Sequence, residues 1–109
     1  MNHLIEKIHN LRKWEIENLQ GIDGLEHFVF LTISVMVKQK KTNLTEVYRS
    51  FKYSESTVRL CIRKLEKLCL IKLNKGLDQR FKEIQLTKQG EKIIKQWEQQ
   101  VKVLFNLSN

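Results

Sequence analysis

The sequence predicts a mostly α-helical (α+β) domain that carries one small β-hairpin. Three observations lead to this fold class. The chain has no proline and only four glycines, so long segments run without a helix breaker. Apolar residues recur mainly at the spacing of one helix face, and residues 70–75 and 81–86 have the character of two short strands. The length of 109 residues supplies one hydrophobic core, so residues 1–109 are expected to form a single domain.

The N-terminal third contains two predicted helices. Leu4, Ile8 and Leu11 follow at i, i+4 and i+7 and predict a helix from about residue 4 to residue 19, which the sequence GIDG ends. The next run, FVFLTISVMV, is apolar on every side, and periodicity alone does not distinguish a buried helix from a buried strand there. Its length favours a helix over residues 25–39.

A short third helix is predicted next, with Thr42 or Asn43 available to cap it. One face of this helix carries its apolar residues, which are Leu44, Val47, Tyr48 and Phe51.

An amphipathic helix of about fifteen residues follows in the sequence SESTVRLCIRKLEKLCLI, which starts at Ser54. Ser54 can cap this helix by accepting the backbone N–H of Thr57. Its inner face is apolar and comprises Val58, Ile62, Leu65 and Cys69. Its outer face combines a small hydroxyl with four cations, which are Ser56, Arg59, Arg63, Lys64 and Lys67.

The C-terminal part is predicted to be a hairpin followed by a long helix. The hairpin turn covers residues 76–80, and Thr87 can cap a helix that runs to about residue 107. That helix carries an apolar stripe formed by Ile94, Trp97, Val101 and Leu104. The stripe needs a cover, either the chain's own first helix or a second copy of the chain.

Positive charge is concentrated in the middle of the chain. Residues 38–82 carry 13 Lys or Arg and 4 Asp or Glu, a net +9, whereas residues 1–37 carry −2 and residues 83–109 carry +1. A concentrated cationic patch is what binding to a phosphate backbone requires. The alternative interpretation is a lysine-rich solvated surface.

Helix, turn, capped basic helix, hairpin and long helix together describe a winged helix-turn-helix. The recognition-helix segment SESTVRLCIRKLEKLCLI and the wing DQRFKEIQLTKQG, which begins at Asp78, are similar to those of the MarR family of bacterial transcription regulators. The resemblance covers roughly residues 43–105 and implies a homodimer that binds double-stranded DNA. The compact length is closer to that of the SarA type.

The wing matches the family at five places, which are Asp78, Arg80, Leu86, Thr87 and Gly90. The resemblance implies that Asp78 holds Arg80 across the hairpin tip so that its guanidinium enters the minor groove, where negative potential is concentrated. The alternative is a surface ion pair at a β-turn.

Two positions depart from the family pattern. Cys69 stands where the family usually has a glycine after the recognition helix, at a place that favours a left-handed backbone. Leu60 stands where the family usually has a polar or basic residue, and it either contacts a thymine methyl or is buried. Cys61 and Cys69 are interpreted as small buried hydrophobes; the alternative is a redox switch.

The resemblance and the charge assign roles to the basic segment, for which residues 42–86 are the expected DNA-binding core. Residues at the start of the recognition helix are expected to reach bases or nearby phosphates, with Ser54 as cap: Ser56, Thr57, Arg59 and Arg63. Four lysines are expected to contact phosphates: Lys64, Lys67, Lys75 and Lys82. Residues 1–20 and 88–107 are the expected dimerisation helices, through Leu4, Ile8, Leu11, Ile94, Trp97, Val101 and Leu104.

The sequence contains few features of an enzyme, a metal-binding protein or a membrane protein. The chain shows no phosphate-binding glycine loop and no nucleophile elbow, so no enzyme and no cofactor are predicted. His3, His9 and His27 lack the spacing of a helical metal pair. The longest apolar run has ten residues against about 20 for a membrane span, which favours a cytoplasmic protein. Two alternatives remain, a plasmid-partition or replication accessory protein that binds DNA through the same fold, and a winged helix that binds protein.

Overall fold

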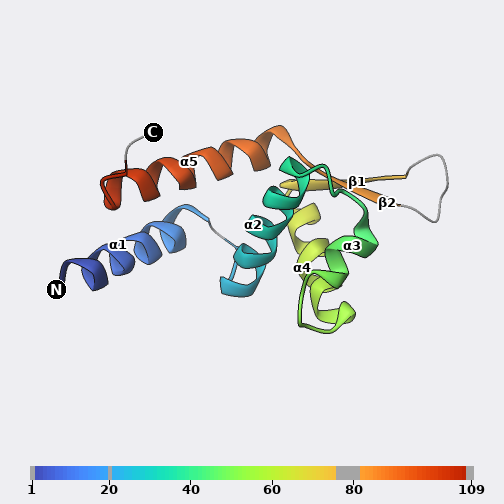
Figure 1. Ribbon diagram of the computed structural model, residues 1–109, viewed down its shortest axis with the longest axis horizontal. Coiled ribbons are helices and arrows are strands. Elements are labelled where there is room, and N and C mark those ends of the chain that lie inside the picture. Colours follow the sequence, from blue (N-terminus) through green and yellow to red (C-terminus); the bar gives the residue numbers. More distant parts are fainter. Residues whose placement is uncertain (1, 20, 76–81, 108–109) are drawn as a thin grey trace.

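The computed structural model describes residues 2–19, 21–75 and 82–107 of the chain (Figure 1). Its elements are, in order, α1 (Asn2–Asn18), α2 (Gly24–Lys38), α3 (Leu44–Arg49), α4 (Glu55–Lys67), β1 (Ile71–Lys75), β2 (Lys82–Leu86) and α5 (Lys88–Leu104). The two strands pair antiparallel, with Ile71 opposite Leu86 and Lys75 opposite Lys82. The predicted fold class, mostly helical with one hairpin, is confirmed. Residues 76–80, the predicted turn, lie outside the described residues.

The apolar run at residues 28–37 is part of a helix, as its length indicated. The start of α2 is fixed by a reciprocal capping box. The carboxylate of Asp23 accepts the backbone N–H of Glu26 at 2.8 Å, and the carboxylate of Glu26 accepts the backbone N–H of Asp23 at 2.9 Å. This local signal favours a helix over a strand, and the β-branched residues Val29 and Ile33 then point into the core.

The core lies between α2, α4 and the hairpin. Helix α2 packs against α4, β1 packs against α4, and β2 packs against α2. The largest fully buried side chains come from all of these elements and from α3: Phe30, Ile33, Ile62, Leu65, Ile71, Ile84, Val29, Val47 and Val58.

Helix α3 is shorter than its predicted apolar face. It ends at Arg49, so Phe51 follows the helix, although its side chain is still buried. Asn43 caps the helix by accepting the backbone N–H of Thr45 at 2.8 Å. The other candidate cap, Thr42, accepts the backbone N–H of Ile84 through its carbonyl at 2.8 Å. The segment before α3 therefore joins the edge of the hairpin.

The start of α5 is tied to the chain that follows α4. The hydroxyl of Thr87 accepts the backbone N–H of Gly90 at 2.9 Å, as predicted for its cap, and donates to the carbonyl of Cys69 at 2.6 Å. Gly90 approaches the backbone so closely that a Cβ there would lie 2.1 Å from the carbonyl oxygen of Leu70. The Leu-Thr-x-x-Gly pattern of the wing thus has a packing cause as well as a capping one.

Helices α1 and α5 run side by side and extend together away from the rest of the molecule (Figure 1). The molecule measures 52 × 28 × 22 Å, and its radius of gyration is 15.2 Å, compared with about 13 Å for a compact domain of this length. Helix α5 ends three residues before the predicted position because Asn106 has a left-handed φ of 53° and the N–H of Leu107 bonds the carbonyl of Lys102. Within the described residues, no helix is long and apolar enough to cross a membrane.

Candidate nucleic-acid interface

The outward face of α4 carries a stripe of residues at i, i+4, i+7 and i+11: Ser56, Leu60, Arg63 and Lys67. All four are exposed, and the opposite face is buried through Val58, Ile62 and Leu65. Leu60 is 65% exposed, which rules out the buried alternative considered for it. The stripe is therefore free to contact a ligand along about three turns of helix.

Hydroxyl groups cluster at the N-terminus of α4. Ser54 caps the helix by accepting the backbone N–H of Thr57 at 3.2 Å, as the sequence predicts. Its hydroxyl also lies 2.8 Å from that of Thr57 and 3.2 Å from that of Ser56. The helix terminus thus presents hydroxyl groups together with partly positive N–H groups, an arrangement that suits an anion.

Arg59 lies on one flank of the stripe and leans toward α3. Its guanidinium pairs with Glu55 at 3.1 Å and lies 5.5 Å from the centre of the Tyr48 ring. Burial raises the pKa of Tyr48 above its ordinary value, and Arg59 partly opposes that shift. The Arg59 side chain is consequently positioned by protein contacts before any ligand arrives.

Lys64 lies on the other flank and leans toward α2. Its ammonium is 3.0 Å from the Glu26 carboxylate, which also belongs to the capping box of α2. The side chain of Lys64 is about half-exposed, so the pair joins α4 to α2 at the protein surface. The structure places Lys64 in an interhelical contact that the sequence did not indicate.

The wing is described only in its strands. Lys82, at the start of β2, is exposed. The turn residues Asp78 and Arg80, and the side chain of Lys75, lie outside the described part of the chain. The predicted minor-groove contact therefore stays a prediction.

The residues predicted for a dimer surface fall into three groups. Leu4 and Ile8 are exposed, at 57% and 44%. Ile94 is buried in the chain's own core, so its side chain packs within the same chain. The others are half-buried, namely Leu11, Trp97, Val101 and Leu104.

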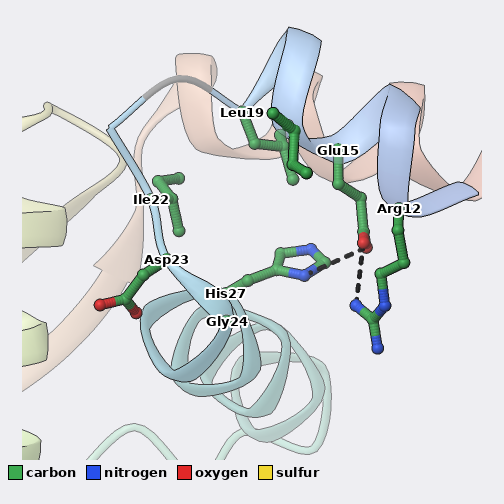
Figure 2. A pocket seen from close by; sticks show the side chains of 8 residues that line it. Arg12, Glu15, Leu19, Ile22, Asp23, Gly24 and His27 are labelled. Carbon is green, nitrogen blue, oxygen red and sulfur yellow. Dashed lines mark hydrogen bonds and ion pairs between the residues drawn. The ribbon is translucent and has the colours of Figure 1, made fainter.

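A buried carboxylate that the sequence analysis missed joins three helices, and Figure 2 shows its contacts with Arg12 and His27. Glu15 of α1 is 8% exposed; one of its oxygens accepts the indole N–H of Trp97 in α5 at 2.9 Å and lies 3.2 Å from Nδ1 of His27 in α2. The other oxygen accepts the Arg12 guanidinium at 2.9 Å. One signal in the sequence could have predicted this burial. Glu15 stands at i+11 from Leu4, on the helix face that Leu4, Ile8 and Leu11 define.

His27 belongs to this cluster by burial as well as by contact. It is 7% exposed, and its ring meets that of Trp97 edge to face at 5.7 Å. Burial lowers the pKa of His27, and this effect outweighs the opposing field of Glu15. Two open hollows, of about 320 and 350 Å³, border the cluster and share Arg12, Glu15, Gly24 and His27. In the described part of the chain, no group of three or more His, Cys, Asp or Glu could hold a metal ion.

The two cysteines have different surroundings. Cys61 is buried, and burial raises the pKa of its thiol, which keeps the thiol protonated and unreactive. Cys69 is exposed, so the expectation that it is a buried hydrophobe was wrong. Its φ is +62°, the left-handed conformation anticipated at this position, because the Cys69 N–H bonds Glu66 and the Leu70 N–H bonds Leu65 as the chain leaves α4.

Helices α3 and α4, the hairpin that follows them and the flanking long helices define a MarR-like winged-helix fold. The chain is similar over its full length to a crystal structure of a MepR mutant from a multidrug-resistant Staphylococcus aureus clinical isolate, with 22% identity and a TM-score of 0.63 over 84% of that chain. MepR is a MarR-family winged-helix regulator, so the predicted resemblance is confirmed at the level of the fold. No protein-family model and no curated protein matches the sequence.

Proposed function

We propose that the protein is a homodimeric transcription regulator that binds a short pseudo-palindromic DNA duplex through α4 and the wing. The observation that carries this proposal is the outward stripe of α4, where Arg63 and Lys67 are exposed and have no ion-pair partner among the described residues. The stripe lies within the +9 segment of the chain. A helix with this face fits the major groove, where side chains meet base edges and phosphates.

The flanking residues support the same proposal in a different way. Arg59 lies over the Tyr48 ring of α3 and Lys64 pairs with Glu26 of α2, so both cations are oriented beside the outward stripe by contacts with neighbouring helices. In this proposal the start of α4 reaches bases or nearby phosphates through Ser56, Thr57, Arg59 and Arg63. Four lysines contact phosphates, namely Lys64, Lys67, Lys75 and Lys82. Arg80, held by Asp78, enters the minor groove.

DNA binding is tested by fluorescence anisotropy with a mixed-sequence duplex at several salt concentrations. We expect a log–log slope of several units per dimer, because each phosphate contact releases counterions. Lys67→Ala should weaken all sequences about equally and lower the slope, whereas Lys92→Ala, on the exposed face of α5, should change neither. Absence of binding at about 50 mM salt would refute the proposal and favour the protein-binding alternative.

Specific recognition is tested by selecting bound sequences from a random duplex pool and then comparing variants on the selected site. Arg80→Ala should weaken the specific site by about 1–3 kcal/mol and leave the fold intact. If a folded Arg80→Ala variant binds the selected site as tightly as the unmodified protein, Asp78 and Arg80 form only a surface ion pair and Arg80 does not contact the minor groove. The spacing of the selected half-sites reports the dimer geometry, for which about 34 Å or a multiple is expected.

The dimer is proposed to form through the arm of α1 and α5. Leu4 and Ile8 lie on the same face of α1 as Glu15 and Leu19, and that face is buried at its C-terminal end but exposed at its N-terminal end. The exposed end has apolar character, and a second copy of the arm would cover it. We further propose that residues 42–86 form the DNA-binding core and that residues 1–20 and 88–107 serve dimerisation within one domain.

Sedimentation equilibrium tests the dimer at tens of micromolar. The double variant Leu4→Asp with Ile8→Asp should remain helical and become a monomer, because neither side chain contributes to the subunit core. Ile16→Asp is the matched control, since Ile16 is 77% exposed on a different face of α1. A monomeric parent protein would refute the proposed assembly.

A further inference from the structure

Leu60 is an apolar residue in the middle of the outward stripe of α4. Its side chain is 65% exposed, with Ser56 one turn before it and Arg63 about one turn after it. A single exposed leucine is ordinary on a protein surface. The position of this one needs an explanation because it is the centre of the face that the proposed function places in the major groove.

The protein itself makes little use of the Leu60 side chain. Leu60 is not among the described residues that form the core or pack against it. The cations beside it are drawn to the flanks, Arg59 by Glu55 and Tyr48, and Lys64 by Glu26. Leu60 is therefore an exposed apolar side chain between the polar residues Ser56 and Arg63 of the stripe, and it is accessible to a ligand.

The major groove offers one apolar group on the base edges, the C5 methyl of thymine. Leu60 is in the second turn of α4, near the N-terminal end from which recognition helices contact bases. The exposed neighbours of Leu60 include Arg59, Arg63 and Lys64, and this positive charge favours a polyanion such as DNA as the occupant. We propose that Leu60 reads thymine at one position of each half-site by contact with its methyl group. This inference rests on the proposed function and specifies part of its sequence preference.

The test replaces thymine with uracil, one position at a time, in the duplex selected from the random pool. Uracil lacks only the methyl group, so pairing and the hydrogen-bonding edge are kept. We expect one position per half-site where the replacement lowers the affinity about fourfold, the equivalent of about 0.8 kcal/mol for a buried methyl-sized group. Leu60→Ala should bind the thymine and uracil duplexes equally. Val35→Ala, at a residue of α2 that is 53% exposed, is the matched control and should keep the fourfold difference.

Each outcome decides the matter. Equal binding of thymine and uracil at every position by the unmodified protein would overturn the Leu60 assignment while leaving specific DNA binding in place. A difference that persists in Leu60→Ala would also overturn it. If that variant fails to fold, Leu60→Gln gives the same comparison, since Gln has a helix propensity close to that of Leu. Failure to select any duplex would refute the proposed function itself, and the inference with it.

Discussion

Replacing Gly90 with alanine should destabilise the fold strongly. A Cβ at this position would lie 2.1 Å from the carbonyl oxygen of Leu70, where an ordinary contact is 3.4 Å or more. The carbonyl has little freedom to move, because it accepts the backbone N–H of Thr87 at 3.1 Å. The first turn of α5 would therefore have to move away from the chain that enters β1.

The size of the effect follows from two opposing contributions. Overpacking a well-packed site costs about 1–3 kcal/mol, and a clash with backbone belongs at the upper end of that range. Alanine gains about 0.5–1 kcal/mol over glycine within a helix. We expect a net loss of about 2 kcal/mol in the free energy of unfolding, which lowers the Tm by about 8–16 °C for a domain of this size.

Thermal and urea unfolding followed by circular dichroism provide the measurement. Gly24→Ala is the matched control, because it also lies in the first turn of a helix, α2, and a Cβ there meets nothing within 4 Å. That control should be neutral or stabilising by about 0.4–1 kcal/mol. A Gly90→Ala protein that melts with the parent, or a Gly24→Ala protein that loses as much stability, would refute the close-approach explanation.

Further predictions concern the end of α4 and the buried cluster. Cys69→Gly should stabilise the protein by about 0.5–1 kcal/mol in urea unfolding, because glycine adopts the left-handed conformation without the Cβ penalty. Glu15→Ala should cost about 2–3 kcal/mol by leaving buried donors without an acceptor, whereas the exposed Glu17→Ala should change stability by less than about 0.5 kcal/mol. Burial lowers the pKa of His27, so the unfolded chain binds its proton more readily, and stability should fall as the pH drops below the ordinary value of 6.5. His27→Gln should flatten that decline in a Tm series from pH 7.5 to 5, and the exposed His9→Gln should leave it unchanged.

Local signals in the sequence predicted the helix starts well. The caps at Ser54 and Thr87 each depend on a hydroxyl and a backbone N–H three residues later, so a short stretch of sequence contains the whole interaction. Helix ends were less predictable. Helix α5 stops early because Asn106 accepts a left-handed conformation, and the periodic pattern of apolar residues continues past that point.

Contacts between distant residues were not predictable from the sequence. The Glu26 carboxylate meets Lys64, and Glu15 meets Trp97, across separations of 38 and 82 residues that no local pattern encodes. The contact of Lys64 with α2 was therefore not foreseen from the sequence, and its assignment to DNA phosphates stays a prediction. The exposure of Leu60 was not predictable for the same reason. Helical spacing allowed its side chain to be either buried or exposed, and only the positions of the neighbouring helices decide between the two.

The orientation of α4 relative to the arm of α1 and α5 is set by a short, tightly bonded junction. Cys69 ends the turn after α4, its carbonyl accepts the Thr87 hydroxyl, and the same hydroxyl caps α5 at Gly90. Because these two hydrogen bonds join the end of α4 to the start of α5, we expect α4 and the arm to keep their relative orientation. In the proposed dimer, the distance between the two copies of α4 would then depend on how the arms pack. A change in how the arms pack, including one caused at the buried Glu15 cluster, would therefore alter the distance between the two copies of α4 and so the half-site spacing. The position of α4 within each copy would stay the same.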